Sequence, residues 1–221
     1  MPRASRMGLD SYIARQISNP SGRFAPLVAR LLNSGNRALN LEAIADLDLR
    51  PGLRVLDIGF GGGVSLPELA ARVGDHGMVA GIDLSAAMVA RARGRFRQQL
   101  RAGHLELEQG SIESLPWPDA AFDRSLSVNT IFYWPDTAAG LREVWRVLRP
   151  DGVLVLALRS QRAVAPAHLE RFGFKNVSAA ELERLLAAAG FSGIVLREVA
   201  GGLAGGAVVA RAVKRQPGAE S

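Results

Sequence analysis

Short apolar runs alternate with helical patterns through the middle of the chain, and this alternation constrains the fold more than any other feature. Strands are expected at residues 54–58, 78–84, 105–109, 122–127 and 153–158, and helices at 64–73, 85–100 and 136–148. Ser85 is the expected N-cap of the second helix, and the run Arg149-Pro150-Asp151-Gly152 closes the third. Strands that alternate with helices in this way form doubly wound, mainly parallel sheets, so the sequence predicts an α/β fold.

The C-terminal part continues with one more helix and a hairpin. Ser178 and Glu181 form a capping box, and Gly190 follows the helix as a C′ glycine. Two further strands are expected at residues 194–199 and 207–212, joined by the glycine-rich loop 201–206. This hairpin would place one antiparallel strand at or near an edge of the sheet.

Helices are also expected before the sheet. Apolar stripes indicate helices at about residues 10–18, 22–34 and 36–47, with a break at residues 19–22 between the first two. We therefore divide the chain into an N-terminal helical segment (1–48), the sheet-forming domain (49–215) and a disordered tail (216–221).

Composition excludes several classes of function. The chain has no cysteine, so it has no disulfides and no thiolate nucleophiles or metal ligands. No apolar run reaches the roughly 18 residues of a membrane span, and no signal peptide is recognised at the start, so a cytoplasmic protein is expected. The net charge is +6, and the densest basic run, Arg91 to Arg101, is interpreted as a solvated helix face. A face that contacts phosphate or membrane is the alternative.

A glycine-rich turn follows the first expected strand, in the sequence Asp57-Ile58-Gly59-Phe60-Gly61-Gly62-Gly63. Glycine tolerates positive φ and lets a ligand approach the backbone closely, and ligands of such sheets bind outside the carboxyl ends of the strands. The dinucleotide fingerprint G-x-G-x-x-G fails in both frames, because its last position is Val64 or Leu66. Asp57 would repel a pyrophosphate and suits a cationic ligand better.

A second carboxylate, Asp83, ends the neighbouring strand. There it can accept hydrogen bonds from both hydroxyls of a ribose. The alternative role, capping the following helix, is already filled by Ser85.

With these residues in place, residues 53 to about 157 resemble the class I S-adenosylmethionine-dependent methyltransferases, especially the ubiquinone/menaquinone C-methyltransferase group. The matching pieces are VLDIGFGGG, GIDLSAAM, LEQGSIESLPWPDAAFD, SVNTIFYWPD and LREVWRVLRPDGVLVLAL. The resemblance implies a Rossmann-like, doubly wound, seven-stranded sheet with one antiparallel strand. It also implies S-adenosylmethionine as cofactor and in-line transfer of its methyl group.

The resemblance further implies a set of cofactor-binding residues. Four of them surround the methionine part, one holds the ribose, and the others lie near the adenine or the acceptor: Asp57, Gly59, Gly61, Gly63, Asp83, Leu84, Met88, Ser111, Ile112 and Asn129. Ser111 stands where related enzymes often have an aspartate, and its hydroxyl can still bond to the adenine amino group. A local turn bond is the alternative role of Asn129.

Acceptor contacts are expected from aromatic residues and one histidine. Phe132, Tyr133 and Trp134 would form an aromatic wall, or would pack on the following helix instead. His168 follows the fifth strand, and Tyr12 and Phe24 belong to the N-terminal segment, which we expect to act as a lid. No catalytic residue and no metal is assigned, because in-line methyl transfer requires neither a covalent intermediate nor a metal.

The expected acceptor is a small molecule, because the sequence shows no nucleic-acid-binding domain or motif. The alternatives are a nicotinamide-dependent oxidoreductase on a similar sheet, a non-catalytic binding protein, and a methyltransferase that acts on a lipid or macromolecule. The sequence names neither the acceptor, nor its methylated atom, nor the oligomeric state.

Overall fold

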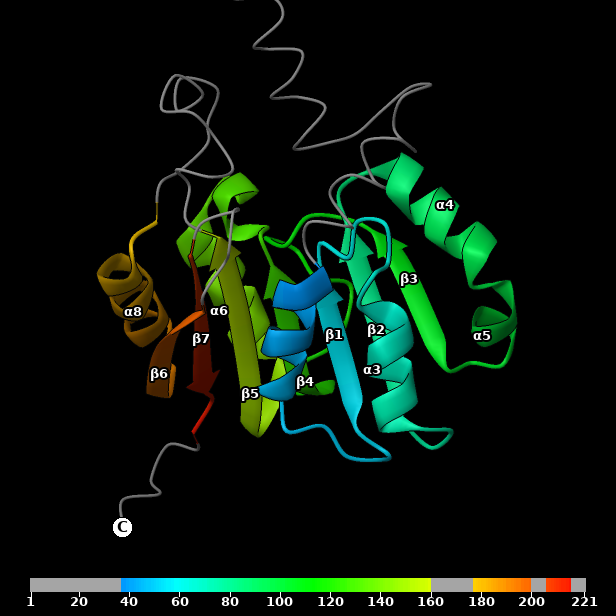
Figure 1. Ribbon diagram of the computed structural model, residues 1–221, viewed down its shortest axis with the longest axis horizontal. Helices are drawn as coiled ribbons and strands as arrows, with labels where there is room; N and C mark the ends of the chain where they lie inside the picture. The colour runs from blue at the N-terminus through cyan, green and yellow to red at the C-terminus, as the bar shows by residue number, and fades with distance from the viewer. Residues whose placement is uncertain (1–36, 160–176, 200–205, 216–221) are drawn as a thin grey trace, which may run out of the picture.

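Seven strands form one sheet in the computed structural model, which describes residues 37–159, 177–199 and 206–215. The strand order is β3-β2-β1-β4-β5-β7-β6 (Figure 1). The strands are β1 (Arg54–Ile58), β2 (Met78–Asp83), β3 (Leu105–Gln109), β4 (Phe122–Val128), β5 (Leu148–Arg159), β6 (Ser192–Val199) and β7 (Ala207–Val213). The first five are parallel, and β7 runs antiparallel to both β5 and β6. The predicted doubly wound sheet with one antiparallel strand is confirmed.

Helices cover both faces of this sheet. The helical segments are residues 37–45, α3 (Leu66–Val73), α4 (Ala86–Arg95), α5 (Arg97–Arg101), the 3₁₀ turn η1 (Ile131–Tyr133), α6 (Thr137–Val147) and α8 (Ala179–Ala188). Residues 37–45 and α3 lie in front of the sheet in Figure 1, and α6 lies behind it. We call these sides the α3 face and the α6 face.

Strand residues alternate between the two faces, as the pleat of a β-strand requires. On β1, Val55 packs into the core on the α3 face, whereas Leu56 and Ile58 pack into the core on the α6 face. The chain order reverses between β1 and β4, which are neighbours in the sheet. Ligands bind at such a switch point in open α/β sheets, outside the carboxyl ends of the strands.

Two expected elements differ in the structure. The helix expected at residues 85–100 is divided at Phe96, whose φ of −108° ends α4. Its ring is buried in the α3-face core, so the chain bends to insert it. The turn expected at residues 149–152 lies inside β5, where Asp151 has a φ of +60° and the backbones of Asp151 and Gly152 bond to Lys214.

The other local predictions stand close to their expected places. The hydroxyl of Ser178 accepts a hydrogen bond from the backbone N–H of Glu181, and Gly190 has a φ of +94° after α8. The arginines between Arg91 and Arg101 are exposed. The helices expected before residue 36, most of the loop at 201–206 and the tail at 216–221 lie outside the described residues. None of the helices in the described part has the length and apolar character that crossing a membrane requires.

Candidate functional site

The glycine turn after β1 adopts the left-handed backbone that its composition predicts. Gly59, Gly61 and Gly63 have φ angles of +70°, +54° and +69°. A Cβ atom on Gly59 would collide with the side chain of Thr130, and one on Gly63 would lie 2.9 Å from the ring of Phe96. A Cβ on Gly61 would meet nothing closer than 4.0 Å, so the backbone at Gly61 is open to a ligand.

Asp83 at the end of β2 is joined to this turn. Its Oδ2 atom accepts a hydrogen bond of 2.7 Å from the backbone N–H of Gly61, and its Oδ1 atom accepts one of 2.8 Å from that of Ser85. The hydroxyl of Ser85 in turn caps α4 by accepting from the N–H of Met88. Asp83 therefore orders the turn and keeps a free lone pair on each oxygen, since a carboxylate oxygen can accept two bonds.

Asp57 lies beneath the turn and is almost fully buried, with 3% of its surface exposed. Burial raises the pKa of its carboxyl to about 7; a hydrogen bond from Ser65 opposes this rise and the nearby charge of Asp83 adds to it. A buried carboxylate without a cationic partner is costly, and a bound cation would remove much of that cost. The site therefore favours a ligand with positive charge next to the turn.

An exposed apolar side chain, Leu84, lies beside Asp83. Leu84 is 54% exposed, although large apolar side chains are usually buried, and Met88 and Ile112 are buried close to the same strand ends. The hydroxyl of Ser111 accepts a 3.3 Å bond from the backbone N–H of Glu113. An exposed leucine next to Asp83, the carboxylate proposed to accept hydrogen bonds from a ribose, provides an apolar contact for a flat ring.

Asn129 follows β4 with a left-handed φ of +59°. Its backbone N–H donates to the carbonyl of Ala157, and its side-chain Oδ1 accepts from the N–H of Arg159, both at 2.8 Å. These bonds join the carboxyl ends of β4 and β5. This side-chain bond differs from the local turn bond named as the alternative role of Asn129, because its partner, Arg159, lies on the neighbouring strand.

The three aromatic residues after Asn129 differ in exposure. Phe132 and Trp134 are buried in the α6-face core, so the packing alternative describes these two. Tyr133 is half-buried, and burial raises the pKa of its phenol to about 12. Of the three rings, Tyr133 alone keeps appreciable exposed surface for an acceptor.

Thr130 was not identified from the sequence. Its side chain packs against Gly59, and its hydroxyl bonds to that of Ser127 and accepts a 3.1 Å bond from the indole N–H of Trp134. Thr130 therefore connects the glycine turn with the loop after β4. No local pattern marks its contact with the glycine turn, because Gly59 is far from it in the sequence and meets it only in the folded chain.

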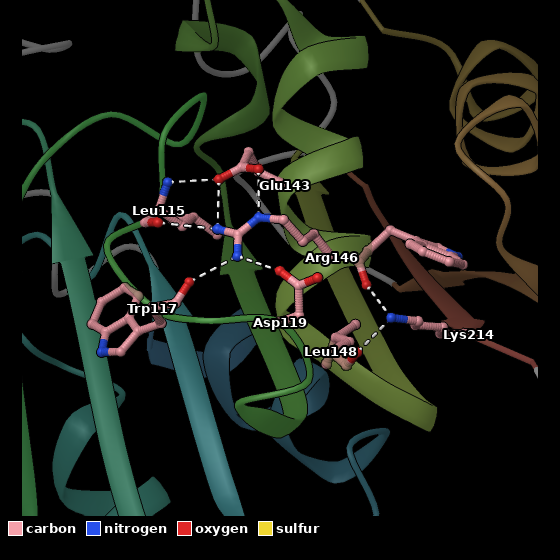
Figure 2. Close-up of polar contacts among 8 residues, drawn as sticks. Leu115, Trp117, Asp119, Glu143, Arg146, Leu148 and Lys214 are labelled. Atoms are coloured by element: carbon pink, nitrogen blue, oxygen red, sulfur yellow. Dashed lines mark hydrogen bonds and ion pairs between the residues drawn. The ribbon is translucent and has the colours of Figure 1, made fainter.

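An arginine in α6 holds the segment that continues from Ser111 and Ile112 (Figure 2). Arg146 donates to the carbonyls of Leu115 and Trp117 and forms ion pairs with Glu143 and Asp119 at 2.7 and 2.9 Å. Glu143 also accepts a 2.8 Å bond from the N–H of Leu115. Hydrogen bonding between the two side chains lowers the pKa of Glu143 and raises that of Arg146. This network fixes the loop between β3 and β4 against α6.

Tyr12, Phe24 and His168 lie outside the described residues. Within the described part of the chain, no group of three or more potential ligands could hold a metal ion.

Comparison with known proteins connects this geometry to one family of sequences. Residues 56–156 match the model of a methyltransferase domain. The chain is 30% identical over 149 residues to the uncharacterized methyltransferase YdaC of Bacillus subtilis, covering 67% of this chain and 80% of that protein. It is 31% identical over 150 residues to the ubiquinone/menaquinone biosynthesis C-methyltransferase UbiE of Geotalea daltonii, covering 67% of this chain and 64% of that protein.

A solved structure shares the fold. The crystal structure of a SAM-dependent methyltransferase from Aquifex aeolicus superposes with a TM-score of 0.68 at 24% identity. The superposition covers 85% of this chain and 97% of that one.

Proposed function

This chain belongs to the S-adenosylmethionine-dependent methyltransferases, and on that premise we propose that it methylates a small-molecule acceptor held over the carboxyl ends of β4 and β5. The Geotalea relative is a ubiquinone/menaquinone biosynthesis C-methyltransferase, and this supports an acceptor of small size.

The observation that carries the proposed site is the burial of Asp57 next to an open glycine turn. Among the described residues, Asp57 has a hydrogen bond from Ser65 but no ion pair, and burial raises its pKa to about 7. The sulfonium and ammonium of S-adenosylmethionine supply the positive charge that this carboxylate lacks. Gly61, which has open space around it, would let the methionine part approach the backbone.

The remaining cofactor contacts follow from the same strand ends. Asp83 would accept hydrogen bonds from the ribose hydroxyls with the lone pairs that Gly61 and Ser85 leave free. Leu84, Met88 and Ile112 would contact the adenine, and the hydroxyl of Ser111 would lie at its edge. We propose that Asn129 contributes less to cofactor binding than the other predicted residues, because its side-chain oxygen already joins β4 to β5.

For this reaction, the main tasks of the protein are to bind the cofactor and the acceptor and to orient them. S-adenosylmethionine supplies a methyl group that is already activated by the positive sulfur. Holding the acceptor in line with that group replaces an encounter in solution by a reaction between fixed partners, which is a large part of the acceleration in such reactions. Tyr133 would contact the acceptor from the loop after β4. We propose that the N-terminal segment, with Tyr12 and Phe24, closes over both molecules and excludes water.

Two measurements on the full-length protein test this function. Calorimetry should show that S-adenosylmethionine and S-adenosylhomocysteine bind, whereas NADH and NADPH do not. A screen with methyl-labelled cofactor over quinols, phenols, amines and lipids should then find transfer to a small molecule. Binding of a nicotinamide cofactor, or transfer to a macromolecule alone, would contradict the proposal.

A further inference from the structure

Arg159 is the last residue of β5, so it lies at the carboxyl ends of the parallel strands, where the glycine turn after β1 also lies. Its backbone N–H donates to Oδ1 of Asn129, and the N–H of Asn129 donates to the carbonyl of Ala157. These two bonds hold the start of the Arg159 side chain beside the loop that follows β4.

The Arg159 side chain starts on the α3 face of the sheet. Val155 and Ala157, four and two residues before Arg159 on β5, belong to the α3-face core, and alternation along the strand places Arg159 on the same side. On β1, Val55 belongs to the same core, so Asp57 is on the same side. Strand β4 lies between β1 and β5, and the register places Asp57 level with Val155, four residues before Arg159. Arg159 therefore lies about 10 Å across the sheet from Asp57 and about 13 Å further along the strands, a separation of about 16 Å. An acceptor next to the methyl donor would extend across this distance.

The guanidinium of Arg159 has an unsatisfied donor. Among the described residues, two side-chain polar atoms are buried without a hydrogen-bond partner, namely Arg159 Nε and Ser125 Oγ. Ser125 is in the middle of β4, whereas Arg159 ends its strand at the candidate site. Three other half-buried arginines, Arg54, Arg124 and Arg146, each donate to a backbone carbonyl. The Nε atom of Arg159 has no such acceptor among the described residues, and a buried donor without an acceptor is costly.

The chemistry of the unpaired Nε–H of Arg159 indicates the ligand that it would bind. The Nε–H and one Nη–H of an arginine point the same way and match the two oxygens of a carboxylate or phosphate. We infer that Arg159 binds an oxyanion carried by the methyl acceptor, either a carboxylate or a phosphate monoester. This inference rests on the proposed function, since it specifies the acceptor of the same site.

The test uses the full-length protein with saturating S-adenosylhomocysteine and three related probes: benzoate, phenyl phosphate and the neutral benzamide. Wild type should bind at least one oxyanion about 10- to 100-fold more tightly than benzamide. In Arg159→Gln this preference should disappear, and in Arg159→Lys it should fall, because lysine keeps the charge but lacks the paired donors. Arg142→Gln, an exposed residue of α6, is the matched control and should retain the preference. Comparison of benzoate with phenyl phosphate shows whether a carboxylate or a phosphate is preferred.

The melting temperature provides an independent test of the inference. Arg159→Gln should have the melting temperature of Arg142→Gln or higher, because Nε loses no partner among the described residues. A markedly lower melting temperature would assign Arg159 a structural role and overturn the inference. The inference would also be overturned if wild type bound all three probes equally, or if Arg159→Gln kept the preference for an oxyanion over benzamide. Failure of S-adenosylhomocysteine to bind wild type would instead contradict the proposed function, and the same calorimetric series measures it separately.

Discussion

The carboxylate of Asp83 accepts a 2.7 Å hydrogen bond from the backbone N–H of Gly61, which joins the end of β2 to the turn after β1. The same carboxylate accepts from the N–H of Ser85 at the start of α4. One side chain thus sets the distance between the proposed methionine and ribose sites before a ligand binds. Substitutions at these positions separate ordering of the turn from contact with the cofactor.

Replacing Asp83 by alanine should weaken S-adenosylmethionine binding by at least about 1–3 kcal/mol, because the ribose hydroxyls lose a charged acceptor. Asp83→Asn keeps one acceptor oxygen and should lose less. Calorimetry on both variants, with circular dichroism to confirm folding, measures the difference. Equal affinity in wild type and Asp83→Ala would remove the ribose role.

Gly61→Val should abolish cofactor binding while the sheet stays folded. A branched side chain at a φ of +54° would be strained and would occupy the open space beside the turn. Gly103→Val is the control, since Gly103 also has open surroundings and a φ of +75° but lies before β3, away from the turn. Both variants should lose similar stability, about 1–2 kcal/mol, and Gly103→Val should bind normally. Normal binding by Gly61→Val would make the turn purely structural.

Asp57 should make stability depend on pH. Its pKa of about 7 in the folded protein is above the ordinary value of 3.8, so folding favours the protonated carboxyl. The stability that this group contributes is fully present below about pH 4 and is lost as the pH rises through about 7. At roughly 1.4 kcal/mol per pKa unit, the loss is at most about 4 kcal/mol. Asp57→Asn should remove this dependence, which denaturant unfolding at several pH values would measure.

The same residue should couple cofactor binding to pH. A cationic ligand pairs with the ionised carboxylate, so wild type should bind S-adenosylmethionine more tightly at pH 8 than at pH 6. Asp57→Asn should bind more weakly and with a flatter pH profile. An unchanged profile in this variant would show that another group titrates.

Deletion of the residues before Asn36 should leave the core folded. The helical residues 37–45 remain and keep their buried contacts through Leu39, Ala43 and Ile44, and Arg197 of β6 still pairs with Glu42 and Asp46 at 3.0 and 2.9 Å. Cofactor affinity should fall modestly, and turnover much further, because the acceptor would be open to water. Calorimetry and a turnover assay decide this. Turnover equal to that of the full chain would contradict the lid proposal, and an insoluble product would assign the segment to the core.

Arg146→Met should destabilise the protein by about 2–4 kcal/mol, because Glu143 and the carbonyls of Leu115 and Trp117 lose a charged donor in a half-buried place. Arg149→Met is the control: Arg149 is more exposed and pairs with Asp123 at 2.8 Å, so its removal should cost less than about 1 kcal/mol. Denaturant unfolding compares the two. Equal losses would show that the network around Arg146 contributes no more than a surface ion pair.

The sequence by itself determined the parallel sheet, the positions of its strands to within a few residues in most cases, and the glycine turn. These features depend on local properties: short apolar runs of strand length, capping residues such as Ser178, and the tolerance of Gly59 and Gly61 for positive φ. Local chemistry also identified Asp57 and Asp83 as candidates, because carboxylates at adjacent strand ends lie at one edge of a parallel sheet.

The tertiary structure decided what depends on residues far apart in the chain. The division of the expected helix at Phe96 follows from burial of that ring in the α3-face core. The contact of Thr130 with Gly59, the bond of Asn129 to Arg159 and the open donor of Arg159 each need two strands to be brought side by side. Local patterns carry no information on these pairings, because their energies arise only when the sheet has assembled and excluded water.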